Sequence, residues 1–321
     1  MSWRATPMFK TGAAALLALA AVFPSLSRAE AFDQGMDTLW EVLWHQSGTA
    51  TRVVRWEEDL KVRVYGASAA TKKAHTLKAL RDVAAEAGLK VIDVSDAADA
   101  AQQANVSIEI VPDSQLSEAQ PCETRLNFGA ETKIDSVTMQ MRESEEWRCA
   151  YHESMHVMGV RGHPEGSTVL SYFATKVEGL QPLDKAMLRA WYSPRARGGM
   201  TPFEMLPILA DELVAILPDK AKAKQSRDRY LSRTVQEMQA FAQGQGDIPM
   251  IVKRCGKSTE QGIRYGRMEM SYFLGVAYLQ GASVARNDTQ AVSWLQRAAN
   301  LGSRPALAQL GAAGASLAGK S

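Results

Sequence analysis

The chain has 321 residues, of which 46% are hydrophobic and 22% are charged, with a formal net charge of +2. This length is enough for a full hydrophobic core and for one or two domains besides a targeting segment. The composition is typical of a globular protein and excludes a low-complexity chain.

The first 29 residues have the pattern of a secretory signal peptide. Arg4 and Lys10 stand before a short apolar run, and Ser27 and Ala29 occupy the small-residue positions before a cleavage site. The run is shorter than the roughly 20 residues that span a bilayer, which argues against a membrane anchor. We therefore expect cleavage after Ala29, a periplasmic or secreted bacterial protein, and no membrane span in the mature chain.

Removal of this segment takes away Arg4, Lys10 and Arg28 and no acidic residue, so the formal charge falls from +2 to −1. The slightly basic composition therefore belongs to the signal. No basic tract remains that would favour nucleic acid or an anionic membrane surface as a partner.

Strand and helix patterns alternate through the first half of the chain. Alternating polar and apolar residues predict strands, and apolar residues at helical spacing predict helices. We expect strands at 61–65, 90–94, 106–111 and 136–141, and helices at 69–87 and 144–158, the last of which ends at Gly159. An α+β arrangement, with a helix packed on a mixed sheet, is the expected result.

The second half has helical patterns throughout. Residues 183–192 form one such pattern, and Thr201-Pro202-Phe203-Glu204 opens the next with a capping box and a proline at the first helical position. A polar helix over 219–242 follows. We place a main domain at 30–217, a helical linker at 218–247 and a small all-α domain at 248–321.

Three of the five histidines fall in one short segment. His152-Glu153-Ser154-Met155-His156 puts two imidazoles one helical turn apart with a glutamate beside them, the His-Glu-x-x-His pattern of zinc hydrolases. Zinc at such a site needs a third protein ligand and an open position for water. A chance match on an amphipathic helix is the alternative. A closed structural zinc site is less favoured, because such sites use several cysteines.

This segment and its continuation resemble the metzincins, especially the matrixin-like ones. Gly159, three residues after His156, lets the chain turn back toward the ion. The family's long motif has a histidine three residues after that glycine, where this chain has Gly162, and His163 follows one place later. Leu170 stands nearest to the family's methionine turn. The resemblance implies a metzincin-like mixed sheet with an active-site helix.

Residues 122–200 also resemble the bacterial domain-of-unknown-function 2927 family. Its members have a cysteine just before a glutamate-centred motif, then a Leu-x-x-x-Asp helix, Tyr-x-Pro and Gly-Met; this chain has Cys149, Tyr192 and Gly199-Met200 in that order. Many members carry Glu-x-x-Gln, so membership alone does not imply catalysis. This chain keeps the full set of ligands.

The resemblance implies a metal-binding role for the matching residues. His152 and His156 would be zinc ligands, and His163 is the expected third ligand. Glu165 and Asp184 stay open as alternatives, because zinc also accepts carboxylates.

Two further residues could act in catalysis. Glu153 would be the general base that takes a proton from water. Tyr172 could donate to a developing oxyanion, although a buried structural tyrosine is the more common role. Specificity loops carry no local signature, so the sequence does not predict the substrate.

Export makes disulfides possible, and the chain has Cys122, Cys149 and Cys255. A Cys122–Cys149 bridge would pin the active-site helix to the loop before it and stabilise the fold by about 3–4 kcal/mol. Cys255 would then be the odd thiol. Three buried free cysteines are the alternative.

Residues 274–302 resemble one SEL-like repeat, a tetratricopeptide-type helix pair in which small residues such as Gly275 allow close packing. Asn287 stands where an aspartate is usual, and Ala306 begins the pattern of a second repeat. Ordinary helix-hairpin packing is the alternative. The repeat implies a protein partner.

Together these features predict an exported zinc metallopeptidase that acts on a peptide or protein and carries an interaction repeat. The alternative is a metzincin-like binding or scaffold protein without turnover, since the third histidine is shifted and the methionine is missing.

Overall fold

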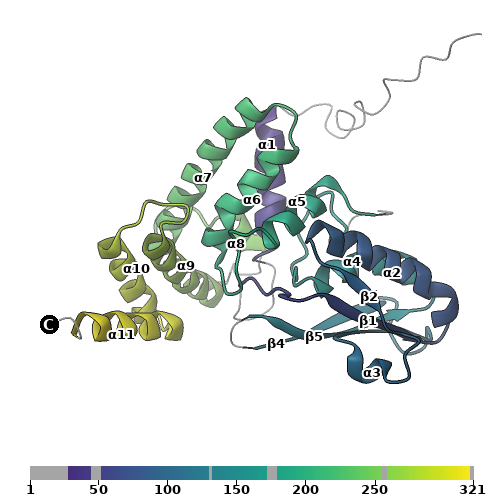
Figure 1. The fold of residues 1–321 in the computed structure, drawn as a ribbon. Coiled ribbons are helices and arrows are strands. Elements are labelled where there is room, and N and C mark those ends of the chain that lie inside the picture. The colour runs from purple at the N-terminus through teal and green to yellow at the C-terminus, as the bar shows by residue number, and fades with distance from the viewer. Residues whose placement is uncertain (1–27, 45–51, 130–131, 172–178, 255–258, 319–321) are drawn as a thin grey trace, which may run out of the picture.

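A computed structural model describes residues 28–44, 52–129, 132–171, 179–254 and 259–318. The protein is mixed α/β, with one five-stranded sheet and a helical C-terminal region (Figure 1). The expected signal lies outside the described residues except for its last two positions, where helix α1 begins. Within the described part, no helix is long and apolar enough to cross a membrane.

The sheet is mixed, as the sequence predicts. Its strands are β1 (Leu60–Gly66), β2 (Val91–Asp93), β3 (Val106–Val111), β4 (Cys122–Phe128) and β5 (Ile134–Arg142). They lie in the order β2-β1-β3-β5-β4, and only β4 is antiparallel to its neighbour. The sequence placed a loop around Cys122; that prediction was wrong, because the residue begins the edge strand β4.

Two helices cover one face of the sheet. Side chains alternate along each strand, so Val62, Ile108 and Met139 are buried while Arg63 and Ser107 lie on the opposite, half-exposed face. Helices α2 (Ala69–Glu86) and α4 (Glu146–Val157) pack on the buried face (Figure 1). The short helix α3 (Ala100–Gln103) joins β2 to β3.

The remaining helices form the other half of the molecule. They are α1 (Arg28–Glu41), α5 (Pro182–Trp191), α6 (Pro202–Ile216), α7 (Lys220–Gln243), α8 (Met250–Arg254), α9 (Glu260–Gln280), α10 (Asp288–Asn300) and α11 (Arg304–Ala318). At the predicted capping box at the start of α6, Glu204 accepts from the Thr201 N–H at 2.8 Å.

An aromatic cluster joins α1, α6 and α9. The ring centroids of Trp40 and Phe203 lie 5.5 Å apart, and those of Trp44 and Phe273 lie 5.6 Å apart. Trp40 and Trp44 are also in edge contact with each other. Since such pairs add to the stability that area burial gives, α1 and the turn after it help to tie the C-terminal helices to the rest of the core.

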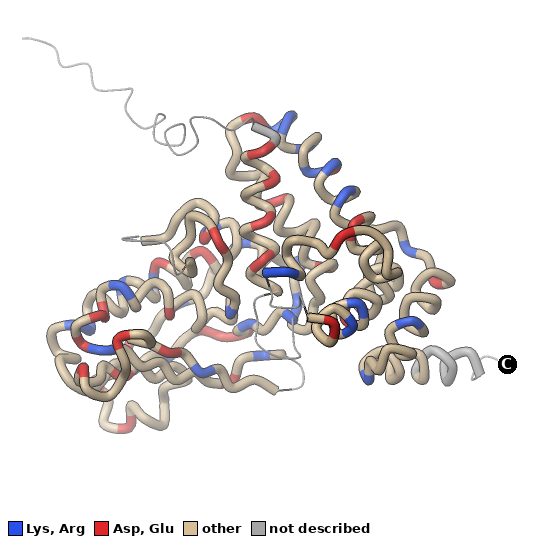
Figure 2. Tube along the Cα trace, turned by 180° about the vertical axis from the view of Figure 1, so that it is seen from behind, with Lys and Arg blue, Asp and Glu red and all other residues tan. Residues whose placement is uncertain are grey.

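Basic residues gather along α7 and acidic residues along the neighbouring α1 (Figure 2). Arg233 on α7 pairs with Asp33 on α1 at 2.9 Å, and Arg227 pairs with Asp211 on α6 at 2.6 Å. These ion pairs hold α7 against the core.

Candidate functional site

Helix α4 carries the histidine segment, and its two ends are fixed by different contacts. At its start Glu146, which is buried, accepts a hydrogen bond from Thr76 at 2.7 Å and lies 2.8 Å from Nδ1 of His75. At its end Gly159 has φ of 86°, and a Cβ there would meet the Val54 carbonyl oxygen at 2.1 Å. Only glycine fits this left-handed turn, which confirms the predicted end of the helix.

The last carbonyl groups of α4 are capped by side chains from distant segments. Trp56 donates its indole N–H to Val157 O at 2.8 Å, and the Tyr192 hydroxyl donates to Met158 O at 3.0 Å. The two acceptors, Val157 O and Met158 O, are carbonyl groups that the end of a helix leaves without a hydrogen bond inside the helix. The position of the helix end is therefore fixed by the core.

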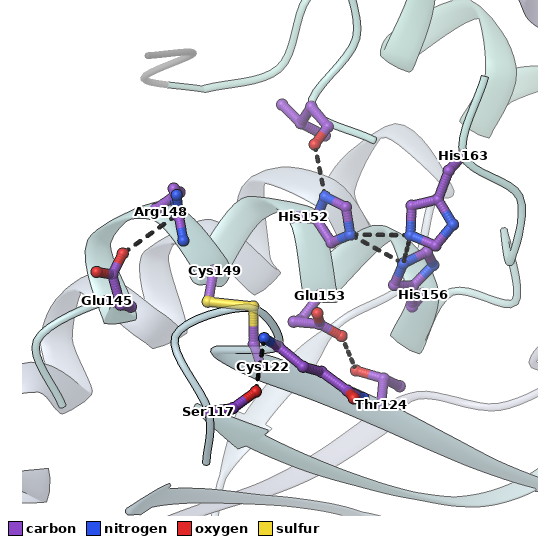
Figure 3. The surroundings of a disulfide bond; sticks show 12 residues. Ser117, Cys122, Thr124, Glu145, Arg148, Cys149, His152, Glu153, His156 and His163 are labelled. Atoms are coloured by element: carbon purple, nitrogen blue, oxygen red, sulfur yellow. Dashed lines mark hydrogen bonds and ion pairs between the residues drawn. A yellow bond between two sulfur atoms is a disulfide. The ribbon is translucent and has the colours of Figure 1, made fainter. Parts of the chain in front are cut away.

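The Nε2 atoms of His152, His156 and His163 meet at one point (Figure 3). His156 Nε2 lies 3.1 Å from each of the other two, and His152 Nε2 lies 3.2 Å from His163 Nε2. Three nitrogens at tetrahedral positions around a zinc ion, each at 2.0–2.1 Å, would be separated by about 3.3 Å. The triangle is therefore of the size that one metal ion requires.

The outer nitrogens of two of these rings determine their tautomer. His152 Nδ1 lies 2.9 Å from Val169 O, and His156 Nδ1 lies 2.7 Å from Val160 O. A carbonyl oxygen only accepts, so each Nδ1 carries the hydrogen and each Nε2 presents a lone pair to the common point. Burial lowers the pKa of both imidazoles to about 4, which keeps the rings neutral at neutral pH.

The carboxylates considered as alternative third ligands lie elsewhere. Asp184 is buried and accepts the backbone N–H groups of Gln181 at 2.8 Å and Val169 at 3.2 Å. Glu165 pairs with Arg254 at 3.3 Å. The structure thus brings His163, and neither carboxylate, to the two helix histidines.

The shifted position of the third histidine has a steric cause. A Cβ on Gly162 would lie 1.9 Å from the carbonyl oxygen of Val42, just after α1. A side chain is excluded at this position of closest approach, so His163, one residue later, reaches the other rings.

The loop that carries His163 is held by α1 and α8. Thr38 donates to Glu165 O at 2.9 Å, and the Glu165 N–H donates to Glu41 at 3.2 Å. Arg254 on α8 pairs with the same buried Glu41 carboxylate at 3.2 Å. The helical half of the molecule therefore positions one of the three imidazoles.

Glu153 projects into a cleft of about 1140 Å³ that is bordered by β4, α4 and the loop of His163. The Thr124 hydroxyl donates to Glu153 Oε2 at 2.6 Å. Burial raises the pKa of the Glu153 carboxyl, while the nearby His152 and the Thr124 hydrogen bond lower it. The same cleft contains all three histidines.

A disulfide joins the two walls of this cleft. Cys122 at the start of β4 is bonded to Cys149 on α4, as the sequence predicts. Cys149 lies one turn before His152, so the bond fixes α4 against β4 (Figure 3). Cys255 lies outside the described residues.

Other expectations for the site have mixed outcomes. Tyr172 lies outside the described residues. Leu170 is fully buried, and its neighbour Val169 supplies the carbonyl that orients His152. The role of Thr124 was missed, although alternation from Cys122 places it on the same face of β4.

The C-terminal helices match one known family. Residues 269–303 match the Sel1 repeat. No curated protein and no solved structure matches the chain. The Sel1 repeat favours interaction with another protein, and here it comprises most of α9 and all of α10.

Gly275 allows these two helices to approach, since a Cβ there would lie 2.7 Å from the Leu295 side chain. Asn287 accepts the Gln290 N–H as the N-cap of α10, which explains the residue at this position of the repeat.

Proposed function

We propose that this protein is a zinc-dependent metallopeptidase that acts on peptides or proteins. The observation that carries the proposal is the contact of two imidazoles with carbonyl oxygens: since Nδ1 of His152 faces Val169 O and Nδ1 of His156 faces Val160 O, the Nε2 atoms of both rings are acceptors. Acceptors 3.1 Å apart do not bond to each other, so a shared cation at this point accounts for their convergence with His163.

The residues of the cleft would perform the hydrolysis as follows. His152, His156 and His163 would hold the zinc, which would supply a Lewis acid for the scissile carbonyl and for water. Glu153 would take a proton from the attacking water and pass it to the leaving amine.

The edge strand supports a peptide as the substrate. Within the described residues β4 is paired on one side only, and it borders the cleft beside Glu153. An exposed strand edge offers its backbone groups to an extended peptide, which binds as a further strand. This arrangement, with an antiparallel edge strand beside a histidine-bearing helix, also supports a metzincin-like core of the domain-of-unknown-function 2927 type.

Metal analysis and peptide profiling test the proposal. Purified protein is expected to contain about one zinc per chain, and His156→Ala is expected to lose it while His75→Ala, outside the cluster, retains it. Zinc-loaded wild type is expected to cleave members of a proteome-derived peptide library, and Glu153→Gln to cleave none. Zinc content unaffected by His156→Ala, or equal cleavage by Glu153→Gln, would overturn it.

The proposal includes export to the periplasm or the medium. The Cys122–Cys149 bond supports it, because such bonds persist in oxidising compartments. N-terminal sequencing of the protein from its bacterial host is expected to begin at Glu30. Recovery of the intact N-terminus from the cytoplasm would contradict export.

A scaffold without turnover is the second candidate, and the Sel1 match at 269–303 favours it. In that case a partner would bind the repeat, and the metal would only stabilise the fold. A Glu153→Gln strain separates the two candidates: the peptidase predicts the phenotype of a deletion, whereas the scaffold predicts the phenotype of the wild type.

A further inference from the structure

Alternate residues of the edge strand β4 face the cleft. Cys122, Thr124, Leu126 and Phe128 all line it, together with Glu123 near the start of the strand. Their partners on β5 include Met139, opposite Thr124, which is buried under α4. Among these four, only Thr124 carries a hydroxyl.

The hydroxyl of Thr124 is committed to one atom of Glu153. The bond from Oγ1 to Oε2 is 2.6 Å long, and the Glu153 side chain is almost fully buried. Figure 3 shows the carboxylate lying between the three histidine rings and Thr124. A hydrogen bond to an ionised acceptor is strong and directional, so it restricts rotation of the carboxylate about its last side-chain bond.

The two elements that carry this pair cannot move apart freely. Cys122 lies two residues before Thr124, and Cys149 lies one helical turn before Glu153. The disulfide thus fixes the strand and the helix close to the point where the hydroxyl meets the carboxylate. The hydrogen bond therefore forms between two elements that the disulfide already holds in place, and it is not a chance surface contact.

We propose that Thr124 is a positioning residue for hydrolysis: it holds Oε2 of Glu153, so that Oε1 is the oxygen that takes the proton. This inference rests on the proposed function. In the step, water loses a proton to Oε1, its oxygen adds to the carbonyl carbon, and the same proton goes to the amine as the C–N bond breaks. Thr124 itself exchanges no proton.

Because the Thr124 hydroxyl is bonded to Glu153, while the backbone of β4 would bind the peptide, loss of the hydroxyl is expected to affect turnover and not binding. Thr124→Val keeps the shape and removes the donor. In zinc-loaded full-length protein we expect kcat to fall about 10- to 100-fold, the size expected for misplacing a general base, with KM and zinc content unchanged. Thr124→Ser is expected to restore kcat to within about threefold, because it keeps the donor. Thr138→Val, on the exposed face of β5, is the matched control and keeps wild-type kcat.

A second measurement needs no activity. A double-mutant cycle of Thr124→Val with Glu153→Ala, in metal-free protein, reports the coupling of the two side chains in chemical unfolding. We expect the change in the unfolding equilibrium constant of the double variant to differ about tenfold from the product of the two single changes. This is the usual size for a hydrogen bond to a charged group.

The outcomes are distinct. Wild type that shows no Glu153-dependent hydrolysis overturns the proposed function and this role with it. Hydrolysis that is unchanged in Thr124→Val, or a fall in kcat that Thr124→Ser does not reverse, overturns the role of Thr124 alone. Additive unfolding energies in the cycle also overturn it.

Discussion

The carbonyl oxygen of Val169 accepts the Nδ1–H of His152 at 2.9 Å, and the N–H of the same residue donates to the Asp184 carboxyl at 3.2 Å. The backbone of one residue thus links a buried acid to an imidazole that the acid does not touch. Asp184 also receives the Gln181 N–H at the start of α5, so a helix cap orients a ring of the cluster.

Asp184→Ala is expected to weaken zinc binding about 10- to 100-fold, the usual cost of removing a partner that orients a ligand. It also leaves the N–H groups of Val169, which is buried, and Gln181, which is half-buried, without this acceptor, which lowers the unfolding free energy by about 1–3 kcal/mol. Chelator competition and urea unfolding measure the two effects. Asp96→Ala, on a side chain 93% exposed, is the control, and a similar loss of zinc affinity there would contradict the role of Asp184.

The Asp184 carboxyl makes stability depend on pH. Burial raises its pKa to about 7 from an ordinary value of 3.8. Between these values the folded state binds more protons than the unfolded chain, so the unfolding free energy falls as pH rises, by at most about 1.4 kcal/mol per pH unit. Above about pH 7 this contribution is constant. Urea unfolding of metal-free protein across this range is expected to show a smaller slope for Asp184→Asn, and equal slopes would contradict the shift.

Gly162→Ala is expected to displace the loop of His163. Its methyl group would overlap the Val42 carbonyl oxygen, and overpacking of this kind costs about 1–3 kcal/mol. We expect a lower unfolding temperature and weaker zinc binding in calorimetry. Gly311→Ala in α11, where a Cβ meets nothing within 4 Å, is the matched control and is expected to be neutral or slightly stabilising.

Arg254→Ala tests the contribution of α8 to the site. The change leaves the buried Glu41 carboxylate without one of its charged partners. Arg254 is 35% exposed, so solvent screens the pair in part, and we expect the unfolding free energy to fall by about 1–3 kcal/mol. Zinc affinity is expected to fall as well, because Glu165 lies two residues after His163. Arg264→Ala, an exposed residue of α9, provides the control. Unchanged zinc affinity in Arg254→Ala would show that the loop keeps its place without α8.

The disulfide predicts the thiol count. Denatured, unreduced protein is expected to show one free thiol, from Cys255, and reduced protein three. Reduction is expected to lower the unfolding free energy by about 3–4 kcal/mol, because the bond closes a loop of 27 residues. Three thiols before reduction would exclude the bond.

The sequence predicted those features that depend on local spacing. His152 and His156 are one turn apart, so their shared face follows from helix geometry, and the glycine that ends the helix follows from backbone sterics. The strand β4 was missed because an edge strand exposed on one side carries polar residues such as Glu123 and Arg125. Helix α1 was missed because its pattern begins inside the expected signal.

Apart from the disulfide, the long-range contacts of the site could not be predicted from the sequence. The one-residue shift of His163 depends on Val42, whose carbonyl oxygen excludes a side chain at Gly162. The sequence leaves Asp184 open as a metal ligand, since a carboxylate near histidines is chemically suitable, but its link to His152 depends on where Val169 lies in space.

The ion pair between Glu41 and Arg254 joins residues 213 positions apart. Contacts of such separation form late in folding, because a large loop must close before they contribute. We therefore expect the loop of His163 to reach its final position only after α1 and α8 have packed together, later than the local helix that carries His152 and His156.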